Sequence, residues 1–154
     1  MNSSDRPGWD EYFMELAQVV KKRSDCIRGH RGSIIVKDKR IIATGYNGTP
    51  MGAKNCFEGG CERCKLRQEG KLASREAEGT CICLHAEENA VIQSAYHGTS
   101  TIGATLYTTD SPCTHCSIMI INAGIKRVVY GLEHHDQDGL PLLTQSGIVV
   151  ELLK

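Results

Sequence analysis

The feature that most constrains the fold of this chain is an alternation of helical and strand-like segments that runs from residue 86 to the C-terminus. Three segments have apolar residues at helical spacing, and three short apolar runs rich in β-branched residues follow them in turn. The helices are expected over 86–97, from 111–116 onward and near 136–145, and the strands over 104–109, 127–131 and 147–153. Because strands joined through helices pair in parallel, this order predicts an α/β sandwich.

The N-terminal part of the chain adds one helix and one hairpin. Residues 9–23 place Trp9 and Phe13 at helical spacing with further apolar residues, which indicates a helix with one buried face. Residues 32–46 are two β-branched runs split by a charged turn and followed by a Gly and Pro loop, which predicts an antiparallel hairpin. Because the two strands of this hairpin pair antiparallel and the later strands pair in parallel, the predicted sheet is mixed.

Length and charge narrow the class of protein. The 154 residues suit one domain. Lys plus Arg and Asp plus Glu both total 18, so no net charge draws the chain to nucleic acid or to an anionic membrane. The first residues lack a signal-peptide pattern, and no apolar run approaches the roughly 20 residues of a membrane helix. We therefore expect a cytoplasmic protein with no nucleic-acid or membrane partner.

The eight cysteines point to metal binding or thiol chemistry, because no secretion signal favours disulfides. Cys113 and Cys116 follow Pro112, so both sulfurs share one face of the first turn of a helix. Alone, this Cys-x-x-Cys is compatible with a metal site, a redox pair or incidental placement. His115 is interpreted as a solvated helix residue, since it points off the shared face.

A histidine and an acid stand at the start of the helix predicted over 86–97. A catalytic zinc takes three protein ligands and keeps one position for water, and His85 supplies the third ligand if consecutive β-α units bring two helix starts to one sheet edge. Glu87 is then placed to act as general acid and base without binding the metal. His-x-Glu followed later by Pro-Cys-x-x-Cys is the signature of zinc-dependent nucleobase deaminases.

Four motifs extend this pattern. They are GYNGTP (45–50), CLHAEENA (83–90), SPCTHC (111–116) and AGIKRVVY (123–130). In this order they resemble the deoxycytidylate deaminases, which convert dCMP to dUMP, and the resemblance runs from about Trp9 to the last strand. It implies one dCMP/CMP-type deaminase domain over 1–154, with a cysteine-rich loop at about 55–83. The implied architecture is a three-layer α/β/α cytidine-deaminase-like fold with a central mixed five-stranded sheet.

The resemblance also assigns roles at the metal. It makes His85, Cys113 and Cys116 the ligands of a catalytic zinc and Glu87 the proton shuttle. Water activated by the zinc would attack C4 of cytosine, Glu87 would protonate N3, and ammonia would leave.

Substrate contacts are implied by the same motifs. Asn47 is expected to bind the deoxyribose, the backbone of Ala86 to meet the cytosine edge, and Tyr130 to contact the substrate. Some family members carry an arginine late in the helix after His-Ala-Glu as a phosphate contact, whereas Tyr96 falls at that place here. The loop cations available to replace it are Arg28, His30, Arg31 and Lys54.

Regulation and assembly are implied only by the resemblance. The family is commonly hexameric, and many members are activated by dCTP and inhibited by dTTP at a separate site. We therefore expect a homo-oligomer, a hexamer, with these effectors and with Mg²⁺ accompanying a nucleotide triphosphate. The product dUMP would supply dTMP synthesis.

Six cysteines remain once the catalytic pair is assigned. They are Cys26, Cys56, Cys61, Cys64, Cys81 and Cys83. A structural zinc held by four of them would order the polar loop, because closed zinc sites contribute folding free energy directly. Family members with a second zinc have ligands that match Cys26, Cys56 and Cys83. The fourth ligand is left open among the other three.

Three alternative functions compete with this interpretation. A tRNA adenosine deaminase shares the metal motifs but needs a surface for RNA, which a neutral chain with few aromatic residues suits poorly. A free cytidine deaminase leaves GYNG and the cysteine-rich loop unexplained. A non-catalytic zinc-binding module, with all eight cysteines structural, gives Glu87 no role.

Overall fold

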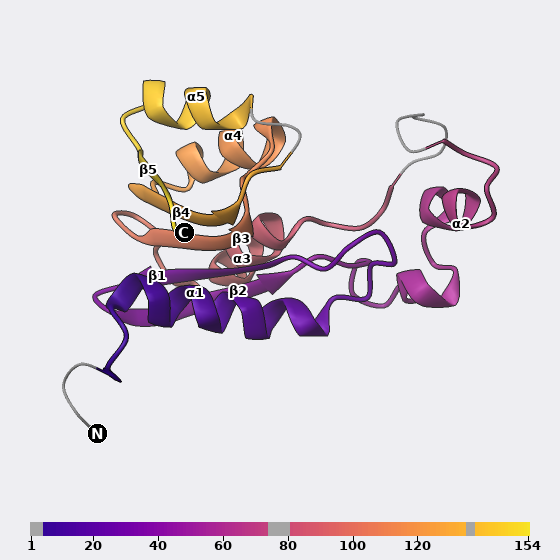
Figure 1. Cartoon of the computed structure of the whole chain (residues 1–154), viewed down its shortest axis with the longest axis horizontal. Coiled ribbons are helices and arrows are strands. Elements are labelled where there is room, and N and C mark those ends of the chain that lie inside the picture. The colour runs from indigo at the N-terminus through magenta and orange to yellow at the C-terminus, as the bar shows by residue number, and fades with distance from the viewer. Residues whose placement is uncertain (1–4, 74–80, 135–137) are drawn as a thin grey trace.

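The computed structural model, which describes residues 5–73, 81–134 and 138–154, is built around a five-stranded sheet (Figure 1). The strands are β1 (Gly32–Lys37), β2 (Arg40–Tyr46), β3 (Thr105–Asp110), β4 (Arg127–Leu132) and β5 (Val149–Leu152). Their order across the sheet is β2-β1-β3-β4-β5. β1 pairs antiparallel with β2 and β3, whereas β4 pairs in parallel with β3 and β5. The predicted mixed five-stranded sheet is therefore confirmed.

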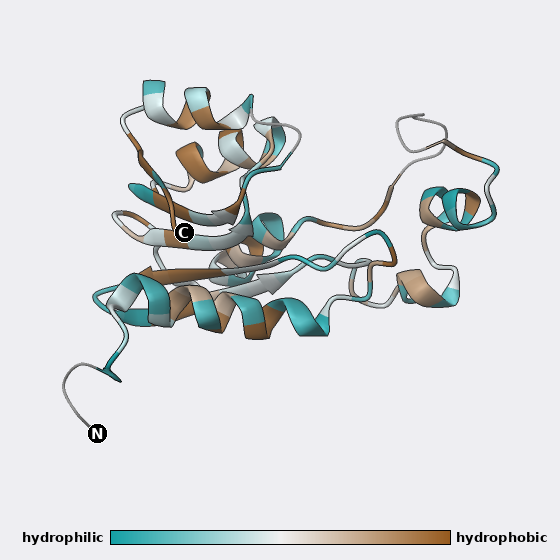
Figure 2. Cartoon of the chain, in the orientation of Figure 1, coloured by the Kyte–Doolittle hydropathy of each residue, from teal (hydrophilic) through white to brown (hydrophobic). Residues whose placement is uncertain are grey.

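Helices cover both faces of this sheet. They are α1 (Trp9–Val20), α3 (Ala86–Tyr96), α4 (Thr114–Asn122) and α5 (Gly139–Gln145). α1 packs on one face through Phe13 against Ile34, and the opposite face packs Ile35 with Ile120 of α4. Successive strand residues point to opposite faces, which is why Ile34 and Ile35 are both fully buried. The result is the predicted three-layer α/β/α arrangement, and Figure 2 shows hydrophobic and hydrophilic residues alternating along α1.

The helix ends differ slightly from the predicted bounds. Residues 21–23, expected in the first helix, form a separate 3₁₀ turn, η2 (Lys21–Arg23). The last helix begins at Gly139, and the start expected at residue 136 lies outside the described residues.

Among the helices that the structure describes, none has the length and apolar character needed to cross a membrane.

The cysteine-rich loop contains two short helices, η3 (Cys56–Glu58) and α2 (Glu62–Gln68). Figure 1 shows α2 beyond the end of the sheet, to one side of the packed layers. The sequence pattern did not predict α2, because the residue that this helix buries is Cys64 and not an aliphatic side chain. Cys64 is therefore the side chain through which α2 is packed.

A polar network ties α1 to the sheet through Asp10. Its carboxylate accepts hydrogen bonds from Tyr107 Oη at 2.7 Å and from Arg127 Nη1 and Nη2 at 2.8 and 2.7 Å. The hydrogen bonds from Arg127 are the main reason that the pKa of Asp10 lies below its ordinary value of 3.8. Because the folded-state pKa is lowered, this carboxylate stabilises the fold above about pH 3.8 and loses its effect as the pH falls further.

We expect Asp10→Asn to lower the free energy of unfolding by no more than about 1 kcal/mol at pH 7, because the pair is partly exposed and screened by solvent. The difference from wild type should shrink towards zero at pH 3. Urea denaturation of both proteins at the two pH values measures it. A difference that is as large at pH 3 as at pH 7 would show that the carboxylate charge is not the cause.

Candidate metal centre and active site

Two helix N-termini bring His85, Cys113 and Cys116 together. His85 immediately precedes α3, Cys113 immediately precedes α4, and Cys116 lies in the first turn of α4. His85 Nδ1 lies 3.5 Å from Cys113 Sγ and 3.3 Å from Cys116 Sγ. The ligand atoms of a tetrahedral zinc ion, with bonds of about 2.0–2.3 Å, stand about 3.3–3.8 Å apart. These three donors therefore fit one zinc ion.

The three donor residues differ in burial. Cys116 is fully buried, Cys113 is partly buried and His85 is exposed, so the site is open on its histidine side. Hydrogen bonds from Cys116 and then from His85 lower the pKa of the Cys113 thiol to about 3, which makes its sulfur a thiolate. Thiolate is the form of cysteine that binds zinc. The site thus offers one thiolate ligand, Cys113, and stays open on its histidine side, where water or a substrate can approach.

Glu87 lies beside the three donors without joining them. Its Oε2 is 3.8 Å from Cys116 Sγ, and its side chain is buried. Its Oε1 accepts a hydrogen bond of 3.1 Å from Thr108 Oγ1, which in turn accepts one of 2.9 Å from Ser33 Oγ. Burial raises the pKa of Glu87, which favours a carboxyl group that can both take up and release a proton.

Ser33 and Thr108 are the site residues that the sequence did not reveal. Both are fully buried, and they come from neighbouring strands β1 and β3. Polar residues in strands are common, and 75 positions separate the two in sequence, so no local motif joins them to Glu87. Their hydrogen bonds fix the direction in which the Glu87 carboxyl group points.

Glu88 has a structural role at the same helix start. Its Oε2 accepts a hydrogen bond from the backbone N–H of His85, and its Oε1 lies 3.1 Å from Nε2 of His115. His115 is largely exposed and lies outside the group of three donors, where the sequence placed it. Glu88 therefore holds the first turns of α3 and α4 together on their outer side.

The GYNG segment packs directly against the start of α3. A Cβ atom on Gly45 would stand only 2.1 Å from the backbone oxygen of Ala86, so only glycine permits this approach of helix and strand. Gly48 and Leu84 exchange two backbone hydrogen bonds, of 3.2 and 2.8 Å, just before His85. Asn89 Nδ2 donates a hydrogen bond of 2.7 Å to the oxygen of Tyr46. These contacts fix where α3 begins.

We expect Gly45→Ala to reduce activity at least about tenfold and to cost about 1–3 kcal/mol of stability, because the added methyl group must push α3 away from β2. Activity assays and denaturation curves measure both effects. Gly8→Ala is the matched control, since its Cβ would be no nearer than 3.7 Å to another residue. If Gly45→Ala matched the control in both assays, the close approach of α3 would not be required.

The three predicted substrate residues occupy different positions around the metal centre. Ala86 is the fully buried first residue of α3, and Tyr130 is the neighbour of Thr108 on β4. The side chain of Asn47 is largely used within the fold, as its Oδ1 accepts hydrogen bonds from Ser24 Oγ and the backbone N–H of Arg31 at 2.6 and 2.7 Å. Its Nδ2 donates one hydrogen bond to a backbone oxygen at 2.8 Å. Within the part of the chain that the structure describes, the second N–H of this amide makes no hydrogen bond.

Tyr96, which stands where some family members have a basic phosphate contact, and the basic loop residues that could replace that contact differ in position. Tyr96 ends α3 and is 80% exposed, and in a helix of 11 residues it stands about 15 Å from the end that carries His85. Arg31 is joined to the active-site side of the sheet, because its Nε lies 2.7 Å from Oδ2 of Asp110, the last residue of β3. The other loop cations that the sequence suggested, Arg28, His30 and Lys54, are exposed.

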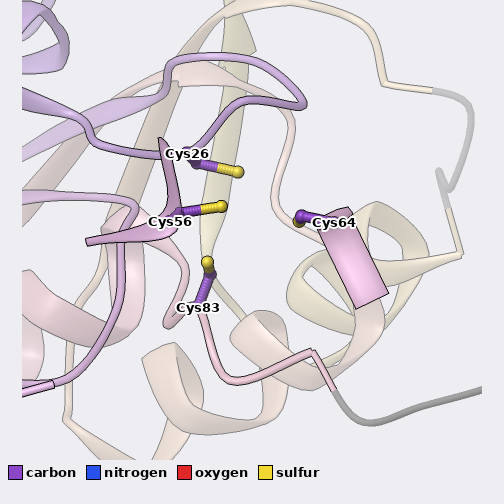
Figure 3. A group of neighbouring side chains, drawn as sticks. All are labelled: Cys26, Cys56, Cys64 and Cys83. Atoms are coloured by element: carbon purple, nitrogen blue, oxygen red, sulfur yellow. The ribbon is translucent and has the colours of Figure 1, made fainter. Parts of the chain in front are cut away.

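The remaining six cysteines gather in a second cluster, at the base of the cysteine-rich loop. The sulfur atoms of Cys26, Cys56, Cys64 and Cys83 all lie within 4.8 Å of one another, and Figure 3 shows these side chains around a common space. Cys61 and Cys81 lie next to this group, with their sulfurs 3.8 Å apart. The structure thus brings Cys64 to the three residues that the resemblance had named.

Comparison with known proteins gives a consistent result. The family model for the cytidine and deoxycytidylate deaminase zinc-binding region matches residues 7–132. Deoxycytidylate deaminase of Saccharomyces cerevisiae is 44% identical over 148 residues, which cover 94% of this chain and 45% of that protein. Deoxycytidylate deaminase of Mycobacterium phage D29 is 44% identical over 132 residues, which cover 83% of this chain and 98% of that protein.

A solved structure supports the same relationship. The dCMP deaminase of cyanophage S-TIM5, crystallised in complex with dCMP and dUMP, is 34% identical, with a TM-score of 0.77 over 96% of this chain and 98% of that chain. The chain spans less than half the length of the yeast relative and nearly the full length of the two phage proteins.

Proposed function

The chain belongs to the cytidine and deoxycytidylate deaminase family, and we propose that it catalyses the zinc-dependent hydrolytic deamination of dCMP to dUMP and ammonia. The observation that carries this proposal is the position of Glu87. A buried carboxyl group, 3.8 Å from a metal-ligating sulfur and held by Thr108, is suited to proton transfer and not to metal binding. The relatives named deoxycytidylate deaminase support the choice of substrate.

In this proposal His85, Cys113 and Cys116 bind the catalytic zinc. Zinc, when bound, supplies a Lewis acid that lowers the pKa of water at its open coordination position. Glu87 takes the proton from the water that attacks C4 of cytosine and delivers it to N3. The attack forms the C4–O bond; Glu87 then carries the second water proton from the new C4 hydroxyl to N4 as the C4–N4 bond breaks, so that dCMP and water give dUMP and ammonia. Thr108 keeps the carboxyl group aimed at this path.

Substrate binding is proposed for the residues named by the resemblance. The remaining amide N–H of Asn47 would contact the deoxyribose, the backbone of Ala86 the cytosine edge, and Tyr130 the substrate beside Glu87. For the 5′-phosphate, the position of Arg31, paired with Asp110 at the end of β3, supports Arg31 over the other basic loop residues. A second, structural zinc is proposed for Cys26, Cys56, Cys64 and Cys83, supported by the closeness of their sulfurs.

We further propose a homo-hexamer in the cytoplasm, activated by dCTP and inhibited by dTTP, with Mg²⁺ accompanying the triphosphates and with dUMP feeding dTMP synthesis. Exposed apolar side chains on α3 and α4, Ile92, Tyr96 and Ile118, support subunit contacts. None of the eight cysteines, all of which lie in the described residues, forms a disulfide, which suits a reducing compartment. Light scattering with and without each effector tests the assembly.

A panel of substrates tests the proposed activity against its alternatives. The ultraviolet absorbance of dCMP, CMP, cytidine and an adenosine-containing RNA hairpin is followed with the zinc-loaded chain. We expect dCMP to be consumed fastest. Turnover of the hairpin alone would support a tRNA adenosine deaminase, turnover of cytidine alone a free cytidine deaminase, and inertness on every compound a zinc-binding module.

A further inference from the structure

We propose that the six cysteines of the second cluster hold two divalent metal ions of the zinc class, with Cys64 and Cys83 bridging the two ions as shared thiolate ligands. This inference goes beyond the proposed function, because it concerns a metal site apart from the deaminase chemistry. It extends the single structural zinc to a binuclear cluster.

The grouping of the sulfur atoms carries this inference. Two sets of four cysteines satisfy the same condition, that all four sulfurs lie within 4.8 Å of one another. The first set is Cys26, Cys56, Cys64 and Cys83, and the second is Cys61, Cys64, Cys81 and Cys83. The sets share two members and differ in two. Two tetrahedra that share one edge have this relation, with the shared edge formed by the bridging sulfurs.

The distance between the terminal sulfurs of the second set fits a tetrahedral site. Cys61 Sγ and Cys81 Sγ are 3.8 Å apart. With zinc–sulfur bonds of about 2.3 Å, two ligands of one tetrahedral ion stand about 3.8 Å apart. A disulfide requires about 2.05 Å between the sulfurs. The pair is therefore spaced as ligands of one ion and not as a bonded pair.

A single ion leaves two of the six cysteines without a role. An ion in the first set alone gives no role to Cys61, which is fully buried, or to its neighbour Cys81. An ion in the second set alone gives none to Cys26 and Cys56, which are 6% and 2% exposed. Two ions with shared ligands use every sulfur.

The net charge of the cluster also favours two ions that share thiolate ligands. Two separate sites of four thiolates would need eight cysteines and would carry a net charge of −4. Six thiolates around two divalent ions carry −2, the same as one ordinary site with four thiolates. Arg63, which precedes Cys64 on α2, has a buried Nε and acts electrostatically on Cys81, so it offsets part of this charge.

The packing of the cysteine-rich loop explains why two ions would be useful. Within the part of the loop that the structure describes, the buried apolar side chains are three cysteines and Leu72, while Phe57 is 63% exposed. Cys26 packs into the same small cluster from outside the loop. Metal–thiolate bonds would supply the folding free energy that a hydrophobic core supplies elsewhere. Cys83 stands two residues before His85, so the cluster also anchors the segment that leads into His85 and α3.

Counting metal ions tests the proposal. The full chain, prepared with zinc and a phosphine reductant, is dialysed and analysed by elemental mass spectrometry. We expect three zinc ions per chain, one catalytic and two in the cluster. Two per chain would overturn the binuclear cluster and leave a single structural zinc, and one per chain would overturn both. The deaminase assay is independent of this count, so failure of the proposed function would be seen separately.

A variant and a spectrum identify the second ion. Cys81 is exposed, so Cys81→Ser should fold, and we expect its zinc content to fall from three to two. An unchanged zinc content would show that Cys81 does not bind zinc and would overturn the proposal. In the chain loaded with ¹¹³Cd, we expect two resonances from cadmium with four sulfur ligands, coupled to each other through the bridging sulfurs. A single such resonance, or alkylation data showing a Cys61–Cys81 disulfide, would overturn the proposal.

Discussion

Replacing Glu87 by glutamine is expected to lower kcat for dCMP by about 10³-fold or more, with the full complement of zinc retained. Proton transfer by a positioned side chain contributes about 10²–10⁴-fold, and here one carboxyl group carries both transfers. Glutamine has nearly the same shape and its amide oxygen can still accept the hydrogen bond from Thr108, so the fold should not change. Loss of dCMP absorbance measures the rate, and elemental analysis measures the zinc.

Glu88→Gln is the matched control for this prediction. It removes the same charge one residue further along α3, but Glu88 contacts the backbone of His85 and the ring of His115 and lies outside the proposed proton path. We expect its kcat to stay within about threefold of wild type, as for most partly exposed ion pairs. A Glu87→Gln protein that turned over dCMP at the wild-type rate would remove Glu87 from the mechanism.

The order of helices and strands could be predicted because apolar periodicity is strong wherever an element packs on the sheet. Ile34 and Ile35 on β1 illustrate this, since they fill opposite cores. Helix α2 could not be predicted in the same way. Its buried residue is a cysteine within a polar segment, so the period that marks an amphipathic helix is absent.

The convergence of His85 with Cys113 and Cys116 could also be anticipated. Parallel strands joined by helices place successive helix N-termini at one edge of the sheet, so residues 28 and 31 positions apart meet there. The support of Glu87 by Thr108 depends instead on register between strands. A shift of one residue would turn Thr108 to the opposite face, and sequence spacing does not determine that register.

For a related reason, the sequence could not predict which cysteine is the fourth ligand of the second metal site. Loop residues have no fixed period, so spacing alone left Cys61, Cys64 and Cys81 equivalent. In the structure Cys64 belongs to both sets of four sulfurs, whereas the other two belong to one. Cys64 is therefore placed to bind an ion in either set.

Replacing His85 by alanine is expected to remove the catalytic zinc and to lower kcat for dCMP by about 10⁴-fold or more. Two cysteines alone bind a catalytic zinc weakly, because such sites need three protein ligands. His85 is exposed, so the truncation leaves no buried cavity, and the thermal midpoint should stay close to that of wild type apart from the contribution of the lost ion. Elemental analysis should find one zinc fewer per chain, with the ions of the second cluster retained.

His115→Ala is the control for this last prediction. It removes the same side chain from the second position of α4, between Cys113 and Cys116, and breaks the contact with Glu88. Because His115 lies outside the group of three donors, we expect its zinc content to equal that of wild type. If His115→Ala lost the ion and His85→Ala kept it, the histidine ligand would have been assigned to the wrong helix start.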